Sequence, residues 1–236
     1  MQSVHPLVRK LLDLETLKTW SVIVTLFGDF DGDYLVGNQI KEILGHLNIK
    51  PEAIRVALHR LKADGWITAE KQGREAIYRL SPKGLHETQV ASKDVYRQDV
   101  KYPEGWQFHL IREGTRRFTS IQISKDLIII PVELAKDLEG SFVLSPQRPG
   151  IPPWIEEKLV PQHLLQNATA LADVLEGVPA ARANMSDLDA RCLRLLVLHQ
   201  WRRLALRLGS WAHIGLLPDG VLAKSHANVT AYLRAR

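Results

Sequence analysis

Residues 49–80 read IKPEAIRVALHRLKADGWITAEKQGREAIYRL, and this stretch holds the pattern that decides the fold. Pro51 suits the first turn of a helix, and the pair Asp64-Gly65 suits its end. Three apolar residues between them fall on one helical face: Ile54, Leu58 and Leu61. That periodicity predicts an amphipathic helix with one face in a core.

The opposite face of this helix is polar and partly basic. Its members are Glu52, Arg55, Val56 and His59, with Arg60 on the flank. Two strand-like segments follow, WITAEK (66–71) and AIYRLS (76–81), joined by the polar QGRE (72–75). They predict a β-hairpin with Arg74 at or near its tip.

Upstream of this stretch the sequence predicts two more helices. TLKTWSVIVTLFG (16–28) is apolar almost throughout and predicts a buried helix, whereas GNQIKEILGHLN (37–48) predicts an amphipathic helix that starts near Asn38. The β-prone YLV (34–36) lies between them. A helix, a short strand, two helices and a hairpin, in that order, are typical of a winged helix-turn-helix.

The winged-helix hypothesis assigns DNA binding to eight residues. The third helix would enter a major groove ~12 Å wide, with Arg55 and His59 at the base edges. Val56 and Arg60 belong to the same predicted surface. Phosphates or the minor groove would be met by Lys50, Lys71, Arg74 and Arg79. The alternative interpretation is a solvated charged face beside an ordinary surface hairpin.

The acidic run FGDFDGDYLVG (27–37) resembles a metal site at first reading, because it holds Asp29, Asp31 and Asp33. A calcium loop starting at Asp29 needs glycine at its sixth position and glutamate at its twelfth, where this chain has Tyr34 and Ile40. The run is instead predicted to be a turn between the buried helix and the short strand. Since phosphates repel carboxylates, we expect it to face away from bound DNA.

Composition places the chain among soluble globular proteins. It has 236 residues, of which 45% are hydrophobic and 24% charged, with a formal net charge of +5. Residues 50–83 carry eight basic and four acidic residues, and 181–236 carry nine and three. No signal peptide and no membrane-length apolar run is recognised, so a cytoplasmic protein is expected. The single cysteine, Cys192, is expected to be a buried thiol.

The rest of the chain predicts a linker, a small α+β unit and a long helix. The linker is the polar segment 89–104, and the unit's strands are expected in WQFHLI (106–111), FTSIQIS (118–124), LIIIPVEL (127–134) and SFVLS (141–145), followed by helices within 155–176. The long helix would run from Ser186, in a capping box, to Gly209. Its wide apolar face indicates packing within the subunit or at a dimer interface. Arginines line its other sides: Arg191, Arg194, Arg202, Arg203 and Arg207.

Several stretches resemble the PaaX family of bacterial transcriptional repressors of aromatic-acid catabolism. They are SVIVTLFGDF (21–30), AIRVALHRLKADGWI (53–67), EKQGREAIYRLSPKG (70–84) and LRLLVLHQWRRLALRLGSWAHIGLLPDGVLA (193–223). The resemblance implies a homodimeric repressor of phenylacetic acid catabolism type that binds a double-stranded operator and is released by an aromatic acyl-CoA such as phenylacetyl-CoA. It also implies a ferredoxin-like middle unit similar to Cas2 nucleases. The candidate effector-binding residues are Arg194, Trp201, Arg202 and Arg203.

The resulting prediction is an α+β protein with a winged-helix domain (1–88), a linker (89–104), a middle α+β domain (105–180) and a helical C-terminal domain (181–236). No cofactor, catalytic residue or metal site is predicted, because P-loop, nucleophile-elbow and HExxH patterns are absent from the sequence. Two alternatives stay open. One is a Cas2-like metal-dependent nuclease, in which Glu113 replaces the aspartate of that family. The other is a DNA-binding module without an effector.

Overall fold

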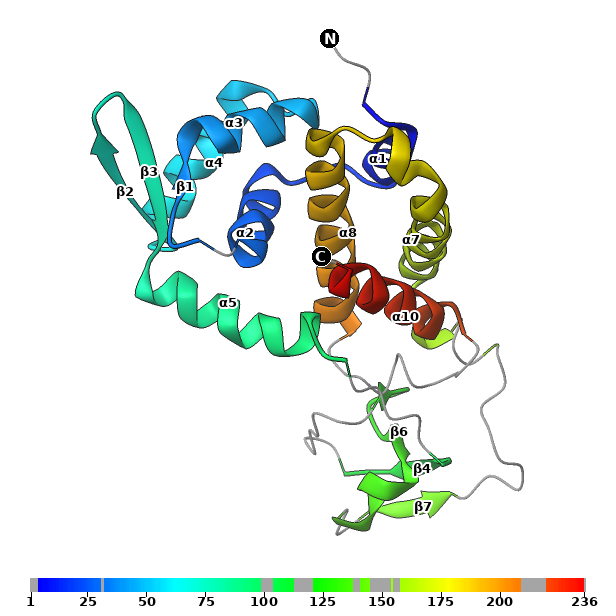
Figure 1. Cartoon of the computed structure of the whole chain (residues 1–236). Coiled ribbons are helices and arrows are strands. Elements are labelled where there is room, and N and C mark those ends of the chain that lie inside the picture. The colour runs from blue at the N-terminus through cyan, green and yellow to red at the C-terminus, as the bar shows by residue number, and fades with distance from the viewer. Residues whose placement is uncertain are drawn as a thin grey trace.

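Helix α8 (Asp187–Leu208) lies at the centre of the fold, with helices from both ends of the chain around it (Figure 1). The structure is a computed structural model. It describes residues 4–30, 32–98, 104–112, 121–137, 141–144, 154, 158–208 and 220–235. Two small antiparallel sheets accompany the helices, so the prediction of an α+β protein is confirmed.

The elements fall into three consecutive groups along the chain. The N-terminal group is α1 (Pro6–Leu12), α2 (Thr19–Asp29), β1 (Leu35–Val36), α3 (Gly37–His46), α4 (Pro51–Ala63), β2 (Ile67–Gln72), β3 (Glu75–Leu80) and α5 (Pro82–Val95). The middle group is β4 (Trp106–Leu110), β5 (Ile121–Gln122), β6 (Leu127–Pro131), the 3-10 helix η1 (Val132–Asp137) and β7 (Phe142–Leu144). The C-terminal group is α7 (Gln162–Ala181), η2 (Arg182–Asn184), α8 and α10 (Val221–Arg234).

The helices and the hairpin expected in the first 80 residues are all present. Helix α4 begins at Pro51 and ends before Asp64, as the sequence predicted. The turn that joins α3 to α4 passes through Asn48, whose φ of +60° lies in the left-handed region that asparagine tolerates better than most residues. The amide of Ile49 then donates to the carbonyl of Leu44 at 3.0 Å and closes the turn. This closure fixes the angle at which α4 leaves α3.

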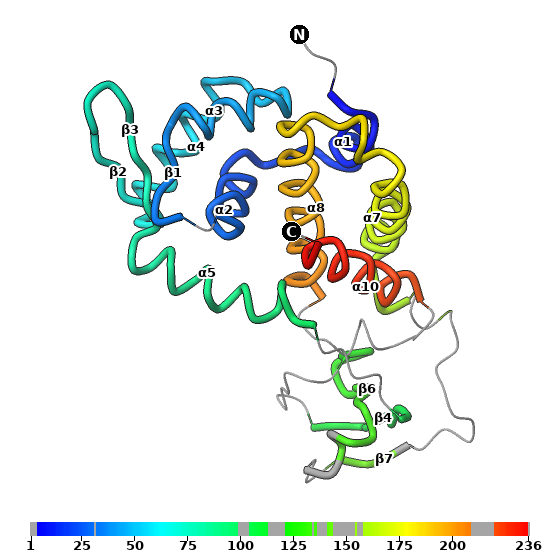
Figure 2. The backbone as a smooth tube through the Cα atoms, in the orientation of Figure 1, coloured from blue at the N-terminus to red at the C-terminus, as the bar shows by residue number. Residues whose placement is uncertain are grey.

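The N-terminal sheet has the strand order β1-β3-β2, with both neighbouring pairs antiparallel. Strands β2 and β3, of six residues each, form a hairpin, and Gly73 at its turn has a φ of +62°. In Figure 2 the hairpin extends away from the rest of the chain. Strand β1 pairs only through Leu35 and Val36, which dock onto Tyr78 and Ile77 of β3. The side-chain amide of Asn38 in α3 also donates to the carboxylate of Glu75, beside the turn, at 2.7 Å, so β1 and α3 together hold β3 along its length.

Helix α5 occupies part of the segment that the sequence predicted as a linker. Its N-cap is Ser81, whose hydroxyl accepts the amide of Gly84 at 3.0 Å and donates to the carbonyl of Gly65. A Cβ on Gly84 would overlap the carbonyl oxygen of Trp66, so this position requires glycine. The helix runs from the base of the hairpin to the lower end of α8 (Figure 2). It therefore connects the hairpin to the C-terminal helices.

The apolar period of α5 was missed because small residues make its inner contacts. Thr88, Ala91, Ser92 and Val95 line a hollow of only about 20 Å³ between α5, α2 and α8. Small side chains at this spacing give a weak hydrophobic pattern, although they allow close packing of helices. Val95 is buried, and its carbonyl accepts the indole N–H of Trp201 at 2.9 Å.

One hydrophobic core joins the two ends of the chain. Its members include Leu11 of α1, Ile23 of α2, Trp201 of α8 and Leu222 of α10, all buried. The wide apolar face of α8 is therefore covered within the subunit, which accounts for it without a dimer interface. The division at residues 88, 104 and 180 stays a prediction, while the core shows that the first and last of these segments pack together.

Polar contacts reinforce this joint at the start of α8. The hydroxyl of Ser186 accepts the amide of Asp189 at 3.1 Å, as expected for a cap. The Asp189 carboxylate, however, accepts the backbone amide of His5 at 3.1 Å and contacts Nε2 of His46 at 2.8 Å. Burial opposes its charge, yet the contacts with His46, Ser186 and His5 together lower the Asp189 pKa. The first turn of α8 thus holds both α1 and α3.

The middle sheet has the strand order β5-β6-β4-β7, and all its neighbouring pairs are antiparallel. It has two small apolar clusters of its own, one around Ile129 and one around Ile130. Helix α7, which follows it, contacts α10, α1 and α8. Within the described part of the chain, no helix combines the length and the apolarity that crossing a membrane requires.

Candidate nucleic-acid interface

Helix α4 divides its residues between a core and an open face, as its periodicity predicted. Ile54, Ala57, Leu58 and Leu61 are buried against the N-terminal core. The residues of the open face are all exposed: Glu52, Arg55, Val56, His59 and Arg60. Val56 is 63% exposed, so its apolar side chain is available for contact with a partner.

An open groove runs between this face, α3 and the hairpin. Its volume is about 540 Å³, and its lining includes Lys41 of α3, Arg55 and His59 of α4, and Ala69 and Tyr78 of the hairpin. Lys62 and Glu52 also line it. Basic groups thus outnumber acidic groups around a concave surface next to a helix, which favours the binding of a polyanion.

The hairpin adds a second set of basic residues. Lys71 and Arg74 are exposed on either side of the turn at Gly73, and Lys50 is exposed at the N-cap of α4. Among the described residues, Lys50, Arg55, Lys71 and Arg74 have no ion-pair partner. Their charges are therefore available to an external phosphate.

Two of the predicted DNA-binding residues have partners within the chain. Arg79 is paired with Glu70 on the neighbouring strand, and its guanidinium lies 5.1 Å from the centre of the Tyr34 ring. Arg60 lies 3.5 Å from Asp64 and stacks over Trp20, 5.8 Å from the ring centre. Exposed pairs of this kind contribute about 0–1 kcal/mol, so a phosphate could exchange with the carboxylate at little cost.

Sequence reasoning missed several residues that the structure adds to this surface. Lys41 and Lys62 line the groove beside Arg55. The ring of Trp20 contacts the guanidinium of Arg60, and the ring of Tyr34 contacts that of Arg79. Lys62 lies two helical turns after Arg55, so helical spacing alone places it on the same face. Lys41 could not be found from local pattern, since its approach to α4 depends on the turn at Asn48.

Residues 32–34 of the acidic run form an irregular connection between α2 and β1, and Asp31 lies outside the described residues. Asp29 has a role that the sequence did not reveal. Its carboxylate accepts two hydrogen bonds from Arg194 of α8, from Nε and from an Nη, each 2.7 Å long. This bidentate pair is mostly buried, and the hydrogen bond to Asp29 raises the pKa of Arg194. The turn is thereby fastened to α8.

The four candidate effector residues have different surroundings. Arg194 pairs with Asp29 and lines a hollow, whereas Trp201 is buried in the core. Arg202 is half-buried under α5, where burial lowers its pKa. Arg203 pairs with Glu15, and this hydrogen bond is the largest effect that lowers the Glu15 pKa. The structure therefore does not give these four residues a common orientation.

The described residues contain no group of three or more histidine, cysteine or acidic side chains placed to hold a metal ion. Glu113, on which the nuclease alternative depended, lies outside the described residues. Cys192 is buried as expected, and burial raises the pKa of its thiol to about 12.

An exposed helix face beside a basic hairpin is the kind of surface that DNA-binding proteins place against a duplex. Comparison with known proteins points the same way. Residues 18–84, which include this whole surface, match the family model described as PaaX-like protein. The transcriptional repressor PaaX of Escherichia coli strain K12 is 32% identical over 112 residues, or 46% of this chain. Both matches are to PaaX proteins, so the resemblance noted in the sequence is confirmed.

The match with the Escherichia coli repressor spans 35% of that protein's length. The chain thus matches about a third of the length of this curated relative.

Proposed function

We propose that the protein is a sequence-specific regulator of transcription that binds double-stranded DNA through a winged helix-turn-helix formed by residues 19–80. The observation that carries this proposal is the free face of α4, where Arg55, Val56 and His59 are exposed beside the basic hairpin. The strand order β1-β3-β2 behind α3 and α4 supports the winged-helix assignment. The match of residues 18–84 to the PaaX-like family model supports it independently.

In this proposal α4 is the recognition helix. Arg55 and His59 reach base edges in the major groove, and Val56 makes an apolar contact such as one with a thymine methyl group. Lys50, Lys71 and Arg74 bind phosphates. Arg60 and Arg79 do the same after exchanging their carboxylate partners, Asp64 and Glu70, for phosphates. The fastening of Asp29 to α8 keeps one carboxylate of the acidic turn away from the DNA.

The finer proposal is a repressor of a catabolic operon, active as a homodimer that reads inverted half-sites. As the family resemblance implies, a small effector of the aromatic acyl-CoA type would release it from DNA. The middle unit is proposed to be ferredoxin-like, and the order β5-β6-β4-β7 with antiparallel neighbours supports that assignment. Cytoplasmic location and the domain boundaries at 88, 104 and 180 belong to the same proposal.

The test uses duplexes that the protein itself selects from a random pool, with binding followed by fluorescence anisotropy at several salt concentrations. Arg55→Ala should weaken binding to the selected duplex by about 1–3 kcal/mol and leave binding to random duplexes nearly unchanged. Arg74→Ala should weaken binding to both and reduce the salt slope by about 1.

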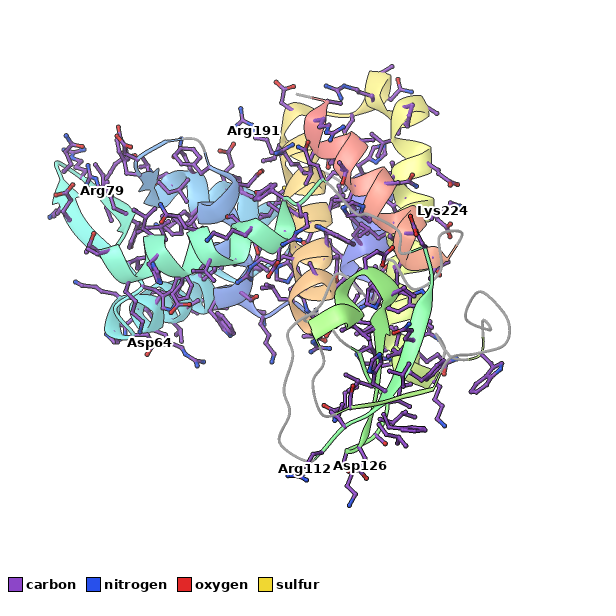
Figure 3. The ribbon with its side chains drawn as sticks, turned by 90° about the horizontal axis from the view of Figure 1, so that it is seen from below. Asp64, Arg79, Arg112, Asp126, Arg191 and Lys224 are labelled. Carbon is purple, nitrogen blue, oxygen red and sulfur yellow. The ribbon has the colours of Figure 1, made fainter. Side chains whose placement is uncertain are left out.

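Arg112→Ala is the matched control, because Arg112 is an exposed arginine at the far end of the middle sheet from Arg79 of the hairpin (Figure 3). It should leave both affinities and the salt slope unchanged. If Arg55→Ala and Arg112→Ala bind the selected duplex equally well, the recognition-helix assignment is wrong. If no duplex is enriched from the pool, sequence-specific binding itself is wrong.

A further inference from the structure

A hollow of about 380 Å³ lies between the start of α8, the end of α7 and the end of α10. Its size falls in the range of small-molecule sites, which begins near 300 Å³. Three arginines line it: Arg182 of η2, and Arg191 and Arg194 of α8. In Figure 3, Arg191 lies on α8 between the N-terminal elements and α10.

The charges of this hollow are not balanced within the protein. Arg182 and Arg191 have no ion-pair partner among the described residues, and Arg194 is the only one of the three that has one. The lining also contains Asp187, which faces the same space, as well as Asp29. Two guanidiniums thus remain free to bind an anion, and arginine is suited to carboxylate and phosphate because its planar fork can donate two parallel hydrogen bonds.

The remaining lining is apolar, apart from one hydroxyl. Val178, Met185 and Leu193 contribute apolar surface, and Tyr232 of α10 faces the same hollow. Burial raises the pKa of the Tyr232 hydroxyl, while the nearby charges of Arg194 and Arg182 act against that rise. A tyrosine that stays protonated can donate to an anion beside the arginines. Such a lining fits a small organic anion with an apolar body.

The hollow reaches the DNA-reading elements through one ion pair. Asp29 is the last residue of α2, which packs against α4, and its carboxylate is held by Arg194. The hydroxyl of Tyr96, just past the end of α5, lies 3.4 Å from the same carboxylate and 3.4 Å from the carbonyl of Gly28. Helix α2 leads into β1, and α5 follows the hairpin. The C-terminal ends of these two helices therefore meet at Asp29, the partner of Arg194.

We propose that this hollow binds the carboxylate or phosphate group of a small organic anion, and that the bound anion replaces Asp29 as the partner of Arg194. The bound group has the same chemistry as the Asp29 carboxylate and can use Arg182 and Arg191 in addition. Loss of the Asp29–Arg194 pair weakens the attachment of the last turn of α2 to α8, and this shifts α2, and the α4 that packs on it, relative to the rest of the protein. Anion and operator DNA then bind antagonistically, and the effect is reciprocal.

The consequence for DNA rests on the proposed function, whereas anion binding does not. The site also revises the effector residues expected from the sequence. It retains Arg194, replaces Trp201, Arg202 and Arg203, and adds Arg182, Arg191 and Tyr232.

The test is isothermal titration calorimetry on the full chain with two probes, benzoate and phenyl phosphate, and benzamide as the neutral isostere. At least one anion should bind with a dissociation constant on the order of 1 mM or below, and benzamide should not bind. If only one anion binds, that result identifies the group which the site prefers. Arg191→Gln should weaken binding about tenfold, because it removes a charged donor that no carboxylate of the described chain uses. The matched control Arg112→Gln should leave binding unchanged.

The variant Asp29→Asn tests the competition itself. It removes the charge that competes for Arg194, so the anion should bind several-fold more tightly than to the wild type. Absence of binding by both anions, equal binding by Arg191→Gln, or weaker binding by Asp29→Asn would each overturn the proposal. DNA affinity without any anion is measured in parallel. If it is normal while the anions fail to bind, the hollow is refuted and the DNA-binding function stands. If anions bind as expected but no duplex does, the function is refuted and the anion site stands.

Discussion

His199 should make the stability of the protein depend on pH between about 6.5 and 4. The side chain lies inside the joint between α8 and α2, is 1% exposed, and has its Nδ1 3.0 Å from the hydroxyl of Thr25. Burial lowers its pKa to about 4, and the positive charges of Arg203 and Arg202 add to the effect, while Glu15 opposes it. The folded protein therefore keeps this imidazole neutral.

The sign and size of the effect follow from linkage. An unfolded histidine has a pKa of about 6.5, so below that pH the unfolded chain takes up a proton that the folded chain refuses. The contribution of His199 to stability is complete above pH 6.5 and is lost progressively as the pH falls toward 4. A shift from about 6.5 to about 4 corresponds to roughly 3 kcal/mol, which is a large part of a typical folding free energy.

Urea denaturation at intervals from pH 7 to pH 4 measures this loss. The variant His199→Leu removes the titrating group and leaves the Thr25 hydroxyl bonded to the carbonyl of Ser21 at 3.0 Å. Wild type should lose about 3 kcal/mol more than this variant across the range. His86→Leu, at an exposed histidine of α5, serves as the control and should follow the wild type. Equal losses in wild type and His199→Leu would refute the reasoning, because other titrating groups would then carry the whole dependence.

Four further substitutions test packing and the open face. Gly84→Ala should cost about 1–3 kcal/mol in urea denaturation, since its Cβ meets the Trp66 carbonyl, whereas Gly45→Ala, with open space around it, should be neutral or slightly stabilising. Trp201→Phe should cost about 1–3 kcal/mol by leaving the buried carbonyl of Val95 without its donor; a variant as stable as the wild type would contradict that. Val56→Ala should change stability by less than about 0.5 kcal/mol and weaken binding to the selected duplex by about 1 kcal/mol; unchanged DNA affinity would remove Val56 from the interface.

Elements with a strong local pattern were predictable from the sequence. Helix α4 and the hairpin have clear start, period and stop signals, so their bounds agree with expectation within a residue or two. Helix α5 was less visible because its inner face consists of small residues. The width of the apolar face on α8 correctly indicated burial, since no lone surface helix needs so much apolar area.

The contacts that hold the two ends of the chain together could not be predicted. Asp29 and Arg194 are 165 positions apart, and neither has a local pattern that names the other. The arginines of α8 were interpreted by type as anion ligands, yet Arg203 is paired with Glu15. Spacing along a helix gives the direction of a side chain but not its partner, which depends on how α1 and α2 dock. The hollow beside Arg191 depends on the same docking.

Because α1, α2 and α3 pack directly on α8, the N-terminal part that we propose to read DNA is not an interchangeable module. A chimaera that transfers residues 1–88 to another protein would expose Leu11 and Ile23, which are buried here in the core shared with helices from the other end of the chain. Recombination, in evolution or in the laboratory, must therefore exchange both ends of the chain together. The middle sheet has separate apolar clusters, and we expect it to be the segment that can be replaced without disturbing the rest.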